Sequence, residues 1–306
     1  MTTLYLTHPA CLDHLTPPGH PERPERLRAV EQVLAGDHFQ PLLRALAPEG
    51  SLDSAALCHD NHYIDELRHI APKDRTIYID GDTSMSPGTW EAVLRAVGGA
   101  VAATDAVLSG ACDNAFVAVR PPGHHAEVGK SMGFCFFDNA AIAARHAQRK
   151  HGLGRVAIVD FDVHHGNGTE DCFTGDQRVL MVSTFQHPFY PYSGTDSRAP
   201  NMLNVPLGRG ADGEEFRTVV SEQWMPRLRE FQPEMILISA GFDAHYEDEM
   251  GGLKLLERDY AWVTAQLTEL AEECAQQRIV SMLEGGYALS ALARSVVAHL
   301  RVLADF

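Results

Sequence analysis

Four short segments of the 306-residue sequence collect histidine, aspartate and tyrosine directly after apolar runs. These segments read RPPGHHAE at 120–127, DFDVHHGNG at 160–168, AGFDAH at 240–245 and EGGY at 284–287. Histidine and aspartate bind metal ions and carry protons, and a tyrosine hydroxyl donates a hydrogen bond to a carbonyl oxygen. If the fold brings the segments together, the chemistry they support is metal-assisted hydrolysis.

The segment DFDVHHGNG contains the first candidate metal ligands. Asp162 and His164 alternate in what reads as an extended stretch, so both side chains, with that of Asp160, are expected on one face. Catalytic zinc typically has three protein ligands and keeps a further position for water, and Asp243 is the expected third ligand. A DxDxH pattern on its own also fits a turn of solvated acids, but the other three segments favour a metal site.

Two further features fit the same site. His124 and His125 follow Pro-Pro-Gly, a rigid turn that projects consecutive side chains into a loop crevice. Beside a metal, such a pair indicates that one histidine transfers protons and the other tunes the charge, and Asp160 could fix the tautomer of one of them. Tyr287 follows two glycines, which let the backbone approach a ligand closely. Its hydroxyl is expected to face a carbonyl oxygen, with packing in the core as the alternative.

The elements that must position these residues are short apolar runs that alternate with longer helical patterns. Continuous apolar runs are typical of parallel strands that are covered on both faces. The runs are LYLT near residue 4, AFVAV at 115–119, VAIVDFD at 156–162, VLMVST at 179–184, MILISA at 235–240 and IVSML at 279–283. This order predicts an open-sheet α/β fold, in which ligands bind beyond the carboxyl ends of the strands.

The helical patterns support the same organisation. Three of them begin at Thr89 (TWEAVLRAVGGAVAATDAVL), Asp138 (DNAAIAARHAQRK) and Tyr260 (YAWVTAQLTELAEECAQQ). A fourth runs from 212 to 231, and Pro226 is expected to kink or divide it. No repeat or flexible linker interrupts the sequence, so we expect a single domain over residues 1–306.

The amino-acid composition indicates which binding partners to expect. Asp and Glu number 41 against 25 Lys and Arg, a formal charge of −16. This charge would repel a phosphate backbone, so nucleic acid is not expected and a cationic substrate fits better, although an acidic surface also simply favours solubility. The six cysteines are scattered without a CxxC pair and are expected to be reduced thiols. The sequence shows neither a membrane span nor a signal peptide, which predicts a cytoplasmic protein.

The motifs together resemble the histone deacetylase family, more closely its class II branch and the bacterial acetylpolyamine amidohydrolases. The resemblance covers nearly the whole chain, in order. The matching stretches are GHPERPERL at 19–27, RPPGHHAE at 120–127, GFCFFDNAAIAA at 133–144, DFDVHHGNGTE at 160–170, SAGFDAH at 239–245 and EGGY at 284–287. The resemblance implies an arginase-like fold, a mainly parallel sheet of about eight strands with helices on both faces.

The resemblance also implies roles for individual residues. By this resemblance, Asp162, His164 and Asp243 bind zinc. His124 and His125 form the pair that transfers protons and provides electrostatic support, and Tyr287 provides the hydroxyl that polarises the carbonyl. The resemblance further implies a structural potassium ion at Asp160, Asp162, His164, Ser183 and Thr184. Gly133, Phe134 and Tyr190 match the walls of a narrow acyl-lysine tunnel, where Phe134 and Tyr190 would sandwich the methylene chain. Asn167 stands where class I members carry an acid that partners the second histidine, as in the class II pattern.

The implied reaction is zinc-dependent hydrolysis of an amide, which releases an acetyl or other acyl group from acylated lysine or a small acylated amine. The alternative substrate is an acetylpolyamine. Polyamine-selective relatives place a Glu seven residues after the third zinc ligand; here that position is Met250, which favours acyl-lysine, although a one-residue shift would bring Glu249 there. Rival interpretations are an arginase-like ureohydrolase, which would need a two-metal site with more aspartates, and a non-catalytic acyl-lysine binding module. A homo-oligomer is possible.

Overall fold

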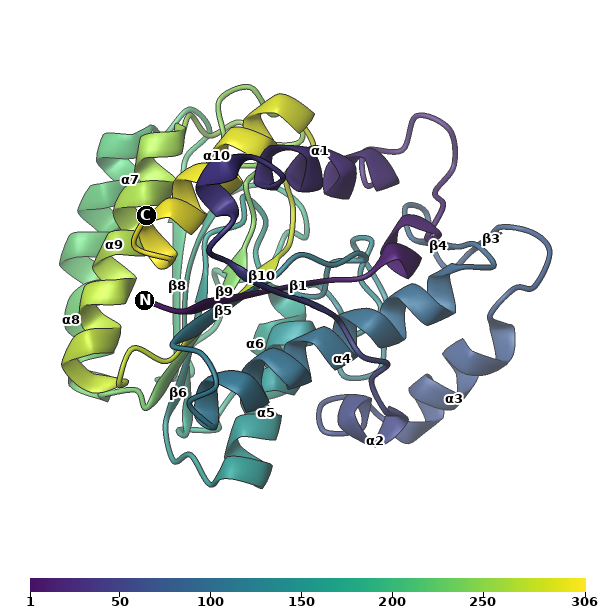
Figure 1. Cartoon of the computed structure of the whole chain (residues 1–306), viewed down its shortest axis with the longest axis horizontal. Coiled ribbons are helices and arrows are strands. Elements are labelled where there is room, and N and C mark those ends of the chain that lie inside the picture. The colour runs from purple at the N-terminus through teal and green to yellow at the C-terminus, as the bar shows by residue number, and fades with distance from the viewer.

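Parallel strands form the centre of the computed structural model, which describes residues 1–306 (Figure 1). The eight strands lie in the order β2-β1-β5-β10-β9-β6-β7-β8, and every pairing in this sheet is parallel. Their bounds are β1 Thr3–Thr7, β2 Leu43–Leu46, β5 Asn114–Val117, β6 Val156–Asp160, β7 Val179–Gln186, β8 Met202–Leu207, β9 Met235–Ala240 and β10 Ile279–Leu283. The predicted parallel α/β architecture is therefore confirmed.

The six predicted strands are all present, but two end earlier than expected. The strand predicted over 115–119 ends at Val117, and the one predicted over 156–162 ends at Asp160. The two strands that were not predicted, β2 and β8, lie at the edges of the sheet. A separate antiparallel pair, β3 (Ile77–Tyr78) and β4 (Ser84–Met85), stands outside the main sheet.

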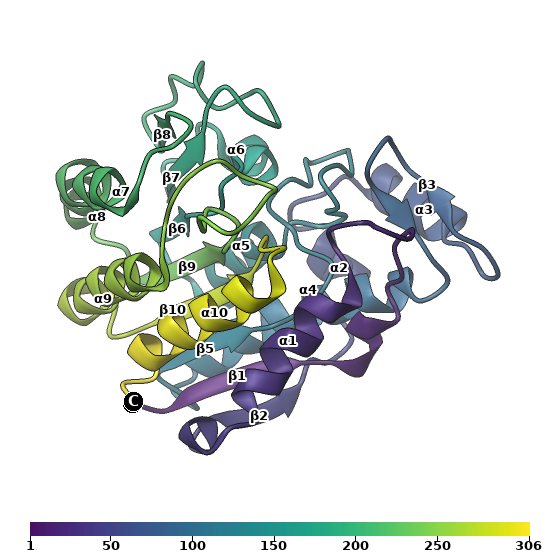
Figure 2. The same cartoon turned by 90° about the horizontal axis from the view of Figure 1, so that it is seen from above.

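Helices cover both faces of the sheet (Figures 1 and 2). One layer contains α1, α7, α8, α9 and α10, and the other contains α4, α5 and α6, with α2 and α3 beyond them. Their bounds are α1 Pro24–Leu34, α2 Leu52–Ala55, α3 Asn61–Ile70, α4 Thr89–Leu108, α5 Asn139–His151, α6 Asn167–Phe173, α7 Gly213–Val219, α8 Met225–Phe231, α9 Glu257–Cys274 and α10 Leu289–Leu303. Because both faces are covered, the side chains of β5, β6, β7, β9 and β10 are fully buried, which explains their continuous apolar runs.

Local sequence signals explain where the predicted helices begin and end. Asp138 caps α5, because its Oδ1 accepts a hydrogen bond from the Ala141 N–H at 2.8 Å, and Gly152 ends it with a left-handed φ of 73°. Pro226 divides the predicted 212–231 helix as expected. A π-helical turn over Val220–Trp224 separates α7 from α8, and the proline is the second residue of α8.

The register of the sheet brings the candidate segments to one edge. Asp160 at the end of β6 pairs with Ser239 on β9 and with Ser183 on β7, and the last residue of β9, Ala240, pairs with Leu283 at the end of β10. All six cysteines are free thiols, as predicted. None of the helices combines the length and the apolar character that crossing a membrane would require.

Candidate active site

The four candidate segments follow four neighbouring strands. In the sheet order these strands are β5, β10, β9 and β6, although the chain visits them in the order β5, β6, β9, β10. Their carboxyl ends therefore deliver His124, Tyr287, Asp243 and Asp162 to one stretch of the sheet edge, where parallel sheets bind ligands.

Asp162, His164 and Asp243 form a buried group that could hold a metal ion, because one ligand atom of each lies within 4.8 Å of the others. His164 Nδ1 lies 3.0 Å from Asp162 Oδ1 and 3.2 Å from Asp243 Oδ2. The sequence suggested an extended strand through residue 162. The strand instead ends at Asp160, and the backbone beyond it forms a series of turns. The Asp160 carboxylate accepts the Asp162 N–H, and the Asp162 carboxylate accepts the His164 N–H, at 3.0 and 2.9 Å. These turns, rather than strand alternation, bring the candidate ligands together.

The chemistry of this group fits a divalent cation such as zinc. Asp243 Oδ2 is buried and accepts no well-directed hydrogen bond, although His164 Nδ1 lies 3.2 Å away, so this oxygen is available to bind a cation. Burial and the neighbouring Asp162 raise the pKa of Asp243 to about 7. The space is kept clear by backbone, because a Cβ at Gly285 would overlap the carboxylates of both Asp162 and Asp243. Two carboxylates and one imidazole are a donor set that zinc accepts.

The two tandem histidines have opposite electrostatic surroundings. Burial alone would lower the pKa of His124, but the carboxylates of Asp160 and Asp162 outweigh burial and raise that pKa well above its usual value. His124 Nδ1 lies 2.9 Å from Asp160 Oδ2. Burial, together with the positive charge of His124, lowers the pKa of His125 well below its usual value. One ring of the pair is thus held as a cation and the other is held neutral.

Asn167 determines the tautomer of His125. Its Oδ1 lies 2.8 Å from His125 Nδ1, while its Nδ2 donates to Glu127 Oε1 at 2.8 Å. Because the amide nitrogen is already donating elsewhere, the amide oxygen faces the ring, and His125 Nδ1 must carry the proton. This leaves the lone pair of His125 Nε2 free to accept a proton.

Tyr287 is fixed from two sides. Its ring lies under the guanidinium of Arg26, 4.8 Å from ring centroid to Cζ, and its backbone N–H donates to Asp248 Oδ2 at 2.6 Å. Arg26 in turn donates to the carbonyl oxygens of Gly286 and Glu284. Burial raises the pKa of the Tyr287 hydroxyl well above its usual value, so the hydroxyl remains a hydrogen-bond donor at neutral pH.

Three supporting residues were not identified from the sequence. Asp248 and Arg26 hold the backbone around Tyr287, and Glu284 Oε2 accepts the Gly123 N–H at 2.7 Å and the His124 N–H at 3.2 Å. All three bind backbone groups of loops distant in sequence, and Arg26 also stacks on the Tyr287 ring, so no spacing rule marks them. The nearest signal was their position inside stretches already singled out, GHPERPERL and EGGY, or just after one.

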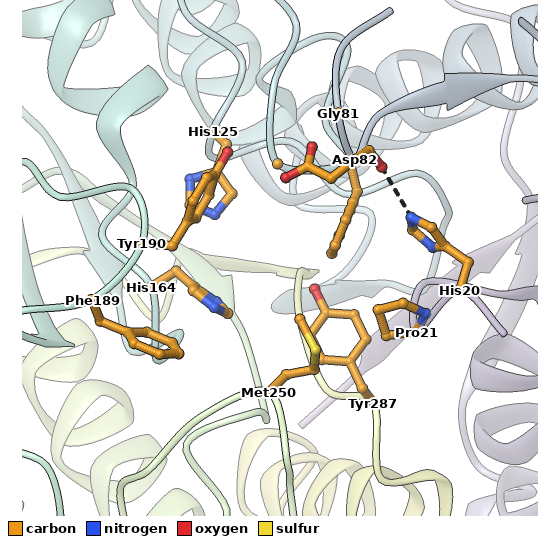
Figure 3. A pocket seen from close by; sticks show the side chains of 12 residues that line it. His20, Pro21, Gly81, Asp82, His125, His164, Phe189, Tyr190, Met250 and Tyr287 are labelled. Atoms are coloured by element: carbon orange, nitrogen blue, oxygen red, sulfur yellow. Dashed lines mark hydrogen bonds between the residues drawn. The ribbon is translucent and has the colours of Figure 1, made fainter. Parts of the chain in front are cut away.

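A cavity of about 430 Å³ opens over this group (Figure 3). His125, His164 and Tyr287 line it, as do all four residues predicted to contact the substrate, which are Gly133, Phe134, Tyr190 and Met250. The sequence did not indicate the remaining lining residues, His20, Pro21, Gly81, Asp82 and Phe189. His20 Nε2 lies 3.0 Å from the Asp82 carbonyl oxygen, which joins two loops of the rim (Figure 3).

The residues predicted to bind potassium also lie together. Asp160 and Ser183 are register partners on β6 and β7, and Thr184 follows on β7. Asp162 and His164 continue the chain from β6, and all five residues are buried.

Comparison with known proteins assigns nearly the whole chain to a known protein family. The histone deacetylase domain family matches residues 20–303. A probable deacetylase of Archaeoglobus fulgidus is 37% identical over 94% of this chain and 82% of its own length. A histone deacetylase-like amidohydrolase of Pseudomonas aeruginosa is 35% identical over 88% of this chain and 73% of its own length. The crystal structure of the HDA15 HD domain superposes with a TM-score of 0.92 at 31% identity, over 100% of this chain and 90% of that one.

Proposed function

Because the chain belongs to the histone deacetylase family, we propose that it is a zinc-dependent hydrolase that removes acetyl or other acyl groups from acyl-lysine or a related acylated amine. The observation that carries this proposal is a single cavity lined both by the candidate reacting residues His125, His164 and Tyr287 and by the aromatic rings of Phe134 and Tyr190. Such a cavity suits a narrow chain that ends in an amide.

Asp162, His164 and Asp243 would hold the zinc ion, which would supply a Lewis acid for the carbonyl and lower the pKa of a water molecule. His125 Nε2 would take the proton from the attacking water and later return it to the leaving nitrogen, since an alkylamine anion does not depart at neutral pH. The Tyr287 hydroxyl would donate a hydrogen bond to the developing oxyanion. His124, held as a cation by Asp160, would stabilise the negative charge of the transition state.

We propose a potassium ion as a second, structural cation. Asp160, Asp162, His164, Ser183 and Thr184 would bind it, largely through backbone oxygens. Register pairing of Asp160 with Ser183 supports this assignment, because it sets the two backbones side by side behind the zinc ligands. A cation there would offset part of the charge of the buried carboxylates.

Acyl-lysine is the proposed substrate class, with acetylpolyamine as the alternative. Met250 lines the cavity and offers no countercharge to a secondary ammonium. Of the three acids before it, Asp248 binds backbone N–H groups and Glu247 pairs with Arg294 at 2.7 Å. Glu249 is exposed and directly precedes Met250.

The other sequence predictions stay predictions. These are one catalytic domain over residues 1–306, a cytoplasmic location, no nucleic-acid or membrane partner, and possible self-association.

Acetate release from an acetyl-lysine peptide tests the proposal. The protein is measured as purified, after removal of metal with a chelator, and after addition of zinc, with metal content determined each time. We expect activity to disappear with the metal and to return with zinc. Full activity in protein verified to be free of metal would show that the mechanism is wrong.

A further inference from the structure

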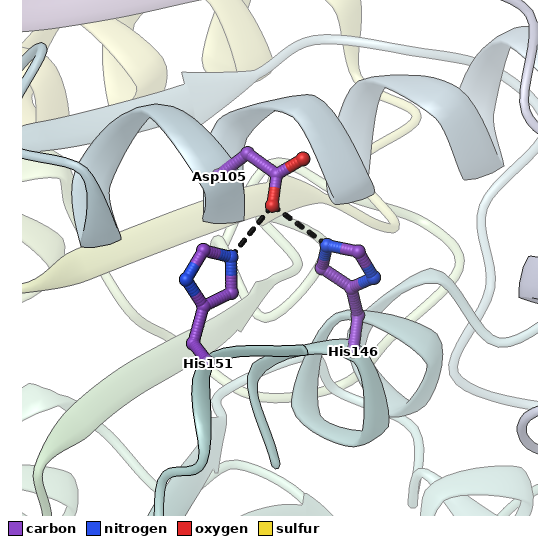
Figure 4. A group of neighbouring side chains, drawn as sticks. All are labelled: Asp105, His146 and His151. Carbon is purple, nitrogen blue, oxygen red and sulfur yellow. Dashed lines mark hydrogen bonds and ion pairs between the residues drawn. The ribbon is translucent and has the colours of Figure 1, made fainter. Parts of the chain in front are cut away.

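A second group of metal-ligating side chains lies between α4 and α5 (Figure 4). His146 Nε2 and His151 Nε2 each lie 2.7 Å from the same oxygen, Oδ1 of Asp105. Asp105 lies in the last turn of α4, and the histidines come from the C-terminal half of α5. We call these three residues the α4–α5 cluster.

The α4–α5 cluster is separate from the candidate active site. Helix α5 spans 13 residues, which corresponds to about 20 Å at 1.5 Å per residue. Its first end, capped by Asp138, follows the cavity loop that contains Phe134, whereas His151 is its last residue. None of the three cluster residues lines the cavity.

The ligand types and their convergence suit a transition metal. Imidazole nitrogen with one carboxylate oxygen is a donor set for zinc, copper or nickel. The three ligand atoms lie within 4.8 Å of one another. Tetrahedral zinc with bonds of about 2.0 Å holds its ligand atoms about 3.3 Å apart, so each 2.7 Å contact would need to open by only about 0.6 Å. Side-chain exposures of 12% for His146 and 21% for His151 allow that movement and leave room for water as a further ligand.

Helix geometry adds an independent attraction for a cation. Helix α4 ends at Leu108 and α5 ends at His151, and the cluster joins the two ends. The C-terminus of a helix carries partial negative charge on its unpaired carbonyl groups. Asp105 and His151 lie in the last turns of these helices, where a positive charge is favoured.

Lys150 orients the carboxylate without occupying the ligand oxygen. Its Nζ lies 2.8 Å from Asp105 Oδ2, while both histidines contact Oδ1. Ligating carboxylates are commonly held by such an outer hydrogen bond. The Lys150 side chain is 57% exposed, so its charge can move away into solvent when a metal enters.

We propose that Asp105, His146 and His151 form a peripheral zinc site that cross-links α4 to α5. Bound zinc displaces the shared hydrogen bonds, and any proton on a ligating nitrogen leaves to solvent. Because the unfolded chain lacks this arrangement, zinc stabilises the folded protein.

The test compares zinc content and thermal stability of three forms of the full chain. These are the wild type, the double variant His146→Gln/His151→Gln, and a matched control, His62→Gln/His69→Gln, which removes two exposed histidines of α3. Each is stripped of metal, loaded with zinc and desalted. We expect the wild type and the control to retain one more zinc ion per chain than the double variant. Zinc at about 100 times its Kd should raise their Tm by about 4 °C more.

Equal zinc content and equal Tm response in all three forms would overturn the proposal and leave the cluster as a hydrogen-bonded ion group. Deacetylase activity of the zinc-loaded double variant should stay within about twofold of the wild type, because the cluster lies outside the cavity. If the double variant does not fold, His151→Gln alone, at the last helical position, provides the same comparison.

Discussion

Asp248 accepts the backbone N–H of Tyr287 through Oδ2 at 2.6 Å. The same oxygen accepts the Ala288 N–H at 2.9 Å, and Oδ1 accepts the Met250 N–H at 3.0 Å. One buried carboxylate thus ties together the loop of the proposed oxyanion donor and the loop of the proposed selectivity residue. Asp248 is therefore a positioning residue for both.

Asp248→Asn should lower kcat for an acetyl-lysine peptide by about tenfold. An amide has only one acceptor oxygen, so its NH₂ group would face a backbone N–H and shift Tyr287. In a Tyr287→Phe background the same change should have little further effect, since it acts through the tyrosine. Glu249→Gln, which removes the same charge from an exposed neighbour, is the control. Fully additive losses in the double variant would contradict the positioning role.

Tyr287→Phe should lower kcat by roughly 100-fold to 1000-fold, because the variant loses a hydrogen bond made in the transition state. The far-ultraviolet circular dichroism spectrum and the zinc content should stay unchanged. Tyr192→Phe is the matched control, because Tyr192 is 75% exposed. A Tyr287→Phe variant as active as the wild type would refute the tyrosine's role.

Met250→Glu should raise the ratio of kcat/KM for N-acetylspermidine to that for an acetyl-lysine peptide by about tenfold, because the new carboxylate can pair with the secondary ammonium. Met250→Gln separates charge from size and should leave the ratio near that of the wild type. The wild type should prefer the peptide. A wild-type preference for the polyamine would show that the substrate class proposed here is wrong.

Protein stability should decrease as the pH is lowered below about 6.5, and His59 should account for part of this decrease. Its Nδ1–H donates to the Glu127 carbonyl at 3.0 Å, and its Nε2 accepts the Asp138 N–H at 2.9 Å, so the ring must be neutral in the fold. Burial lowers the pKa of His59 to about 4, whereas the unfolded value is about 6.5.

Between these two pKa values the unfolded state binds more protons, so the stabilising effect is fully present above about pH 6.5 and is lost as pH falls toward 4. From pH 7 to 5 the expected loss of unfolding free energy from His59 is about 2 kcal/mol. Urea unfolding at both pH values, with His59→Gln for comparison, measures it. Parallel pH dependences of the two proteins would contradict this expectation.

The central fold could be predicted because its strands are buried on both faces. MILISA and IVSML have no polar face, and their side chains are all buried in β9 and β10. The edge strands could not be predicted in this way. Every residue of β2 is exposed, and β8 contains Asn204 and Pro206, which interrupt the apolar pattern. Proline is tolerated there because β8 pairs only with β7.

The proposed metal ligands and the tandem histidines could be identified because their chemistry lies in their side chains. Asp248 and Glu284 could not be identified by the same reasoning, since they work by accepting backbone N–H groups from loops distant in sequence. Asp162 and His164 do lie close together, as expected from the sequence, but not because they alternate along a strand. They come together through turns in which carboxylates bind the backbone.

The cavity over the proposed metal group is assembled from two sets of loops. The proposed zinc ligands come from loops after β6 and β9, whereas much of the wall comes from the loops at 20–21, 81–82 and 189–190. Mutation of the loops at 20–21 and 81–82 can therefore reshape the wall while the reacting groups keep their places, whereas Phe189 and Tyr190 also pack against the rings of His164 and His125. Under the proposed function, a redesign of acyl specificity would therefore begin with the loops at 20–21 and 81–82.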